Sequence, residues 1–505
     1  MRYSAAMVSI AGTLKGLENI SQGRNLKMKP FVTAGVTQSK PAGNPTGTFV
    51  TDPNFDGGVD VKYSLTPSLT LDATYRTDFA QVEVDQQQTN LTRFSLFLPE
   101  KRDSILENSG TFAFGGGNNS NLLPFFSRRI GLSETGTPIP ILGGARVSGQ
   151  ISRYDVGFLA MKTESQDSRP SNNFFAGRVK RKILTNSWFG AVATSRDSST
   201  AADYNRVYGA DIHLQFRNLY FDNYLLQSKT PGAAGHDQAR RFATAWRGDE
   251  VILSAEYNTI QPNFRPDVGF VRRQDITQYS AEASWNPYIR SSNTIRNLRF
   301  GTFADYFEGA GSGEVQTRTQ RANMGIQFQN NGSINFEIEQ TFDRLVREDR
   351  IVGIRIPAGD YRYLAYSASA NRNRSAKISG NIGFDWGEFW NGNRQSFRGG
   401  FLLKPSYRWN AELTYSHDQV KLLSGHNTTS LVGSRFVYAF SARAFVNGFV
   451  QYNTATHQVS SNIRFNFTHH PLSDLFLVYN DVRDSRTGEP LQRAIIVKLT
   501  NLFNF

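Results

Sequence analysis

Apolar and polar residues alternate with a period of two along most of the chain. In the run 69–76, Leu, Leu, Ala and Tyr alternate with Thr, Asp, Thr and Arg, and similar runs occupy 251–257, 321–329, 334–339 and 462–467. Successive side chains of a β-strand point to opposite faces, so each run gives a strand with one apolar and one polar face. The pattern predicts many strands and very little helix.

The length of these runs separates two kinds of β-protein. A water-soluble sandwich also alternates, but its strands are usually about 5–6 residues long. The runs here are commonly about 10–14 residues long, enough for a tilted membrane-spanning strand. Aromatic residues make up 13% of the chain and gather at the ends of runs, as in 384–390. We therefore predict an all-β fold, a single large antiparallel transmembrane β-barrel over 1–505 with about 24 strands (22–26).

Turn sequences join the predicted strands. Asn-Asn-Gly at 330–332 predicts a tight hairpin of the primed type, and Thr-Pro-Ser at 66–68 predicts another turn. Longer polar connections, at 345–359 and 420–427, are expected on the extracellular side of the barrel.

The last predicted strand carries the most specific signal. Ile495, Val497, Leu499, Phe503 and Phe505 share one face, and polar residues occupy most of the other face. Such a strand, ending in Phe, is similar to the signal that the outer-membrane assembly machinery reads. We expect Phe503 and Phe505 to act as an assembly signal, with that machinery as a partner.

The alternation breaks down between Thr77 and Leu142. About sixty residues without a strand pattern inside a compact barrel are expected to be functional, and this segment is too rich in Phe and Leu to be disordered. We predict that 77–142 is a plug that folds into the lumen between early strands. Its charged residues are candidates for a constriction: Asp78, Glu83, Asp85, Arg93, Glu100, Lys101, Arg102, Glu107, Arg128 and Arg129.

Two roles are open for these ten charges. They can pair with one another and with charges of the barrel wall, and so anchor the plug. They can also line a pore and set its selectivity for ions or solutes. The two roles are compatible with each other.

The formal net charge of +13, from 56 basic and 43 acidic residues, allows nucleic acid, anionic lipid or an acidic ligand as a partner. The charges are scattered, without a run of five or six Lys or Arg, and no nucleic-acid-binding motif is present. We therefore expect no nucleic acid as a partner. Anionic solutes are favoured if the excess of positive charge lies on the inner face of the barrel.

Enzymatic chemistry has little support in the sequence. The chain has no Cys, which excludes disulfides, thiolate catalysis and Cys-ligated metals, and its seven His show no ligand spacing. We predict no metal site, no cofactor and no enzymatic activity. A hydrolase at the barrel rim that uses His417 and Asp418 is the third hypothesis.

No stretch of 18 or more apolar residues occurs, which excludes a membrane-spanning helix. Residues 1–14 make a poor signal peptide, because their apolar part is interrupted and no small-residue cleavage site follows. We expect the export signal to lie upstream of residue 1.

A set of short motifs carries a family resemblance. They are Gly23-Arg24-Asn25-Leu26, Gly58–Asp60, Lys62-Tyr63, Asp78-Phe79, Glu83, Asp85, Asn90–Phe94, Glu100-Lys101-Arg102, Glu107-Asn108, Ser127–Gly131, Gly143-Gly144-Ala145, Gly149, Pro266–Val271, Arg273 and the closing strand. Through them nearly the whole chain resembles the outer-membrane barrel domain of unknown function that lies behind family 9 carbohydrate-binding-module-like domains, mainly in Bacteroidetes and related phyla.

The resemblance implies a barrel integral to the bacterial outer membrane, and no assigned activity. Two departures limit it. Asp103-Ser104-Ile105 stands where the family usually has Pro-Phe-Phe. The amino-terminal binding-module-like domain is absent, so carbohydrate binding is not implied.

Two further hypotheses of function are of different kinds. The first is a partly plugged channel or transporter for solutes. The second is a non-conducting barrel that anchors a partner, such as a lipoprotein or another periplasmic or extracellular subunit, in an outer-membrane complex. In either case we expect outer-membrane lipid and lipopolysaccharide as partners.

Overall fold

A computed structural model describes residues 25–40, 47–77, 85–100, 102, 107–116, 121–132, 139–165, 170–200, 202–233 and 235–505. Within these ranges, none of the helices combines the length and the apolar character that crossing a membrane requires.

One antiparallel sheet of 25 strands dominates the structure, and because β29 (Phe503–Asn504) prolongs β28 alongside β1, 24 strands make the wall. They are β1 (Leu26–Ser39), β2 (Val50–Thr66), β3 (Leu69–Thr77), β5 (Ile141–Ile151), β6 (Tyr154–Thr163), β7 (Asn172–Leu184), β8 (Ser187–Ser198), β9 (Tyr204–Phe216), β10 (Leu219–Lys229), β11 (Gln238–Arg247), β12 (Val251–Ile260), β14 (Ile276–Trp285), β15 (Ile295–Glu308), β16 (Val315–Phe328), β17 (Ser333–Leu345), β20 (Gly359–Asn371), β21 (Ile378–Phe389), β22 (Gly392–Ser406), β23 (Trp409–Leu422), β24 (Gly425–Ala439), β25 (Ala444–Asn453), β26 (Gln458–His470), β27 (Ser473–Asp484) and β28 (Pro490–Thr500).

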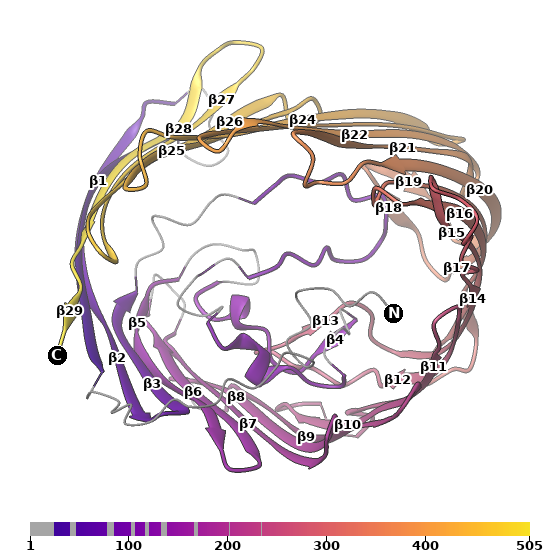
Figure 1. Ribbon diagram of the computed structural model, residues 1–505, viewed down its shortest axis with the longest axis horizontal. Helices are drawn as coiled ribbons and strands as arrows, with labels where there is room; N and C mark the ends of the chain where they lie inside the picture. The colour runs from indigo at the N-terminus through magenta and orange to yellow at the C-terminus, as the bar shows by residue number, and fades with distance from the viewer. Residues whose placement is uncertain are drawn as a thin grey trace.

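The sheet closes on itself. Strand β1 pairs with β2 on one side and with β28 on the other, in a register that runs from Phe31 opposite Thr500 to Ser39 opposite Gln492. Seen down the barrel axis, the strands form a continuous ring (Figure 1). No hydrogen-bonding edge of the wall is left open, which is the condition for a sheet to cross a membrane. The predicted barrel is confirmed.

The two faces of the wall follow the alternation in the sequence. On β28, Ile495, Val497 and Leu499 are exposed, whereas Lys498 and Thr500 on the opposite face are buried. Large apolar side chains are likewise exposed on the outer face of strands around the ring, for example Met324, Ile382 and Leu413. An apolar outer face is stable only in contact with lipid, so the protein is integral to the outer membrane.

The closing strand has the predicted face but not the predicted continuity. Phe503 and Phe505 are exposed, as are the apolar residues of β28 that precede them. The strand is interrupted at Asn501 and Leu502, and β29 then pairs with the start of β1, where Phe503 lies opposite Met28. The role of Phe503 and Phe505 as an assembly signal stays a prediction.

The hairpin at 330–332 is present, but its type differs from the prediction. Strand β16 ends at Phe328 and β17 begins at Ser333, so four residues form the connection. Within it Asn331 alone has a positive φ, of 64°, and the side chain of Asn330 accepts a hydrogen bond from the Gly332 amide. A primed type I turn needs two left-handed residues, so the local asparagine contact replaces it.

The long connections lie at one end of the barrel. Because the strands run alternately up and down, the connections 78–140, 261–275 and 346–358 share an end, and turns of two residues, such as 67–68 and 185–186, occur at the other. Outer-membrane barrels have short periplasmic turns and long extracellular loops, which assigns the long connections to the extracellular end. The predicted long connection at 420–427 is wrong, because β23 and β24 leave only 423–424 as a turn.

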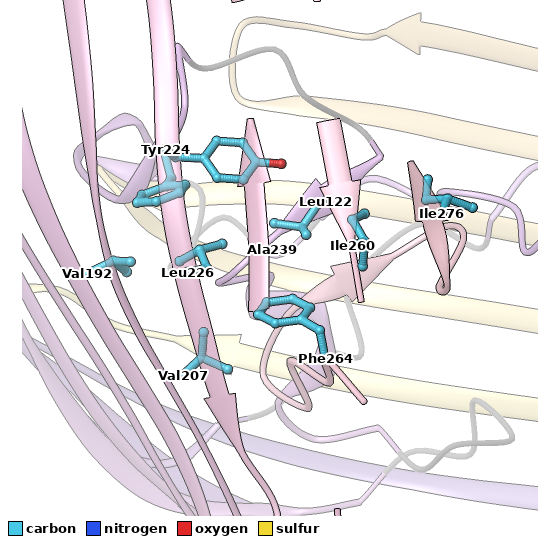
Figure 2. Packing of buried hydrophobic residues seen from close by; sticks show 10 residues of the cluster. Leu122, Val192, Val207, Tyr224, Leu226, Ala239, Ile260, Phe264 and Ile276 are labelled. Carbon is cyan, nitrogen blue, oxygen red and sulfur yellow. The ribbon is translucent and has the colours of Figure 1, made fainter. Parts of the chain in front are cut away.

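Buried apolar clusters lie inside the ring as well as in its wall. One joins Leu122 and Phe114 from the connection after β3 to wall residues such as Val207 and Leu226. Figure 2 shows Leu122 and Phe264 facing these wall side chains. The core of this protein is therefore the contact between the wall and the segments folded into the lumen.

Candidate functional site

Residues 107–116 and 121–132, which follow β3 and precede β5, lie in the lumen against one side of the wall (Figure 1). Their short elements are η2 (Ser109–Phe112), β4 (Leu122–Leu123) and η3 (Ser127–Arg129). Phe112 and Ile130 pack on Leu159 and Phe174 of β6 and β7, and the cluster around Leu122 continues this contact along β8 to β14. Each Å² of apolar surface that this contact removes from water contributes about 25 cal/mol of stabilising free energy. The plug is therefore held to this side of the wall.

A second connection folds inward and completes the plug. Strand β13 (Phe270–Val271) pairs with β4, with Phe270 opposite Leu123. The amide of Phe126 donates to the carbonyl of Val268 at 2.7 Å. The sequence pattern did not mark residues 261–275 as part of the plug. The signal that could have marked them is the set of apolar residues Phe264, Val268 and Phe270, whose side chains are buried.

Charged residues of the wall bind the tip of the plug, by which we mean residues 109–116. Arg178 and Asp211 form an ion pair at 2.7 Å in which both side chains are fully buried. The Gly115 amide donates to Asp211 at 2.9 Å, and Arg178 Nε donates to the Ala113 carbonyl at 3.1 Å. Gly115 has a φ of 64°, and a Cβ there would lie 2.8 Å from the ring of Tyr224, so only glycine fits at this position.

Glu100 and Arg102, two of the predicted charges, form the central anchor of the plug. Arg102 donates to both carboxylate oxygens of Glu100, at 2.8 and 2.6 Å, and to the carbonyls of Ser127 and Ile130. Burial acts to raise the pKa of Glu100, but the hydrogen bonds and charge of Arg102, together with the Ser127 hydroxyl, outweigh it and lower the pKa below its usual value.

The lowered pKa of Glu100 predicts how this anchor depends on pH. Its carboxylate stabilises the docked plug fully above pH ~4.5, and this contribution is lost as pH falls through the lower pKa of the folded state. We expect hydrogen exchange at 127–131, corrected for its intrinsic rate, to stay constant from neutral pH to about pH 5 and to accelerate in more acid solution. Glu100→Gln has no carboxylate to protonate. An equal acceleration of hydrogen exchange in acid solution in that variant would therefore contradict the prediction.

Arg128 closes the base of a loop that crosses the lumen. It forms an ion pair with Asp85, and its Nη1 donates to the carbonyl of Pro99 at 3.0 Å. Asp85 and Pro99 therefore lie beside the same guanidinium, and residues 85–100 leave this point and return to it. We call residues 85–100 the crossing loop.

One pass of the crossing loop is bound to β25. The amide of Gln87 donates to Gln451 Oε1 at 2.7 Å, and Gln451 Nε2 donates to the carbonyl of Asp85 at 3.1 Å. Asn453 Nδ2 donates to Gln87 Oε1 at 2.8 Å. Three hydrogen bonds to one strand fix this side of the loop.

The tip of the crossing loop is bound to the wall at β16 and β17. Arg93 Nη2 lies 3.3 Å from both Asp343 Oδ1 and Thr317 Oγ1. Arg273 stacks on Phe94, with its guanidinium 4.4 Å from the ring centre, and donates to Thr317. Burial, followed by the charge of Arg93, lowers the pKa of Arg273 to about 9, so the Arg273 guanidinium is charged at neutral pH.

The crossing loop thus spans the lumen in front of strands β20 to β24 (Figure 1). Leu91 packs on the apolar cluster of Ile351, Ile356 and Val420. Ile351 and Ile356 belong to the hairpin β18 (Asp349–Ile351) and β19 (Ile354–Ile356), which the sequence presents as part of a polar connection. Between the loop and the wall a cavity of about 200 Å³ is lined by polar side chains such as Gln87, Thr414 and Ser416 together with apolar residues such as Leu431 and Val432.

The structure distributes the predicted charges rather than gathering them in one ring. Glu107 pairs with Lys62 of β2, and Arg129 Nε donates to the Gly269 carbonyl at 3.2 Å. Asp78, Glu83 and Lys101 lie outside the described residues. Those described are anchored to the wall, to the inward connections or to each other. The fully buried wall pair Arg178 and Asp211, which holds the plug, is missed because nothing local marks those two strand positions.

The rim pair considered for hydrolysis is not a catalytic pair. His417 lies on the outer face of β23, where its Nδ1 is 2.8 Å from the Ser430 hydroxyl, and Asp418 is buried on the opposite, inner face. Neighbouring residues of one strand cannot meet across it. Among the described residues, no group of three or more His, Asp or Glu is placed to hold a metal ion.

Comparisons with known proteins leave the activity of this chain open. Residues 24–142 match the model of a domain of unknown function, DUF5916. The motif resemblance is thereby supported for the early strands and the plug, without any link to a carbohydrate-binding module. No curated protein matches the chain.

Similar solved structures are outer-membrane proteins. Acinetobacter baumannii OccAB2 is 8% identical, with 96% of this chain and 100% of that chain covered and a TM-score of 0.35. The siderophore receptor PirA from Acinetobacter baumannii is 9% identical, with 94% and 80% covered and a TM-score of 0.44. The copper transporter OprC is 10% identical, with 95% and 80% covered and a TM-score of 0.45. Similarities this low transfer neither a solute nor a partner.

Proposed function

We propose that the protein is a partly plugged outer-membrane channel or transporter for solutes. A wall of 24 strands encloses a lumen wide enough for water, and barrels of this size are often filled in part by an inward segment. The observation that carries the proposal is the crossing loop, which reaches over part of the lumen and is held at two separated places on the wall. Such a loop constricts a passage.

The attachments of the crossing loop to β25 and β17 are polar, and Leu91 adds an apolar contact with the cluster that includes Ile351. Its contacts with β25 are side-chain hydrogen bonds, and its tip is held by the ion pair of Arg93 and Asp343. The cavity behind it has both polar residues, such as Gln87 and Ser416, and apolar residues, such as Leu431, in its lining. A polar, water-compatible contact can open without exposing a large apolar surface, whereas the opposite side of the plug is sealed by apolar packing.

Excision of the crossing loop tests the proposal. Asp85 and Pro99 both contact Arg128, and the ring of Phe97 packs on the plug residues Phe126 and Phe270. Residues 87–96 can therefore be replaced by a Gly-Ser-Gly linker that keeps these contacts with the plug. We expect the wild-type barrel to show a small single-channel conductance in planar bilayers and the excised variant a several-fold larger one. Shortening the exposed turn at 310–313, at the same end of the barrel, is the matched control and should leave the conductance unchanged.

Equal conductance of the wild-type and excised barrels would show that the loop constricts nothing.

The reversal potential in a KCl gradient reports charge preference. The net charge of +13 favours anions, but many inner-wall charges form pairs of opposite sign, such as Arg241 with Glu256 and Arg398 with Asp385. We therefore expect only a weak preference for anions.

The second proposal is a non-conducting anchor for a partner protein in an outer-membrane complex. It is favoured by the apolar clusters that pack the plug against β5–β14. A barrel that stays silent even after loop excision, and that co-purifies from native membranes with a stoichiometric lipoprotein, would establish it.

We further propose that residues 143–505 share the family of residues 24–142, because the seam between β1 and β28 needs both parts.

A further inference from the structure

An aromatic row crosses the outer face of the wall near its extracellular end. Phe242 of β11, Tyr257 of β12, Tyr279 of β14 and Tyr306 of β15 are direct cross-strand partners. Their ring centres are 6.2, 5.4 and 6.1 Å apart in turn. Phe242 and Tyr279 are among the exposed side chains. Rows of this kind lie where the apolar band of a barrel meets the lipid headgroups.

Two arginines prolong the same row. Tyr306 is paired with Arg318 of β16, Arg318 with Phe342 of β17, and Phe342 with Arg362 of β20. Both guanidiniums stack on the single ring of Phe342, at 6.0 and 5.7 Å from its centre. At the other end of the row, Arg240 stacks on Tyr257 at 5.9 Å.

These three arginines face away from the lumen. Arg240 and Arg318 alternate with the inward residues Arg241 and Thr317, which contact the plug and the crossing loop. Arg362 precedes Tyr363, whose hydroxyl donates to Asp343 inside the barrel. In the described part of the chain no carboxylate lies within ion-pair distance of Arg240, Arg318 or Arg362, whereas nearby Arg344 is paired with Asp360.

We propose that this surface, which we call the arginine row (Arg240, Arg318 and Arg362 with the aromatic rings beside them), binds the phosphate groups of lipopolysaccharide in the outer leaflet. Guanidiniums held by stacking at the headgroup level need an anion, and phosphate accepts charge-assisted hydrogen bonds from arginine. The aromatic rings beside them in the row supply an apolar surface for acyl chains. The proposal concerns the outer face and does not depend on conduction through the lumen.

Lipid A retention tests the proposal. The purified barrel in detergent micelles is titrated with phosphorylated lipid A and with the same lipid after removal of its phosphates, and bound lipid is counted by native mass spectrometry. We expect the wild type to retain phosphorylated lipid A, and each Arg→Ala substitution in the row to weaken retention by about tenfold. Lipid without phosphates should bind the wild type no better than the R240A/R318A/R362A variant.

Arg181→Ala provides the matched control. Arg181 also stacks on a tyrosine, Tyr154, at 5.8 Å, but near the opposite end of the barrel. Its loss should leave retention unchanged. Inorganic phosphate is a separate arm, because a site for the free ion would bind it without lipid.

Three results would overturn the proposal: equal retention of lipid with and without phosphates, an equal loss on Arg181→Ala, or occupation of the row by a second copy of the barrel or another protein. Unchanged conductance and unchanged heat stability of the triple variant would show that the barrel itself is intact. A loss of lipid A in an intact barrel then assigns the effect to the outer surface.

Discussion

Replacing Arg178 by alanine is expected to weaken docking of the plug tip by about 3–5 kcal/mol. The substitution removes the guanidinium that donates to the Ala113 carbonyl and leaves the fully buried carboxylate of Asp211 without its cationic partner. Because a free energy of 1.4 kcal/mol is a factor of ten, hydrogen exchange over 109–116 should accelerate by about a hundredfold or more.

Two variants control this experiment. Lys180, on the same strand, also reaches the plug, where its ammonium lies 3.4 Å from the Gly110 carbonyl, but this contact is exposed. Lys180→Ala should therefore change exchange at 109–116 very little. The double variant R178M/D211L removes both charges at similar volume and should recover part of the docking, because the Gly115 amide and the Ala113 carbonyl still lose their partners. Unaltered exchange in Arg178→Ala would show that the apolar clusters alone hold the tip.

Reversing the charge of Arg93 is expected to detach the tip of the crossing loop and to raise single-channel conductance toward that of the excised barrel. In Arg93→Asp two carboxylates face each other at a largely buried site, where Asp343 also accepts hydrogen bonds from Thr317 and Tyr363. Loss of one partner of such a pair costs about 2–5 kcal/mol, and the like charge adds to it.

Charge exchange separates electrostatics from simple loss of shape. The swap R93D/D343R restores an ion pair across the same contact and should return the conductance part of the way to the wild-type value. Arg408→Asp, in an exposed turn at the opposite end of the barrel, is the control for a changed net charge. If the swap conducts as strongly as Arg93→Asp alone, the pair does not hold the loop.

The wall could be predicted from sequence because its information is local. On β28, alternate residues from Ile495 to Leu499 are apolar, and that pattern alone states which face meets lipid. Strand number and closure follow from repetition of the same pattern. The type of the hairpin at 330–332 was wrong, because the side chain of Asn330 satisfies the turn in a way that dipeptide preferences do not describe.

The contents of the lumen could be predicted only in outline. An interrupted alternation marks 77–142, but the inward turn of 261–275 depends on pairing with Leu122 and Leu123, about 150 residues away in sequence. The partner of Arg93 lies on β17 and that of Asp211 on β7. Sequence shows which side chains carry charge; pairing across a lumen is set by the ring of strands.

The seam between β1 and β28 sets an order on how this molecule can be built. Its two sides are far apart in the chain, and contacts of that kind form late. If contacts form in chain order, the plug meets β5 to β14 first, β16 and β17 next, and β25 near the end, so its last attachments form shortly before the barrel closes. Until the barrel closes, the wall is an open sheet, and the plug is already packed on the face that becomes the inside of the barrel.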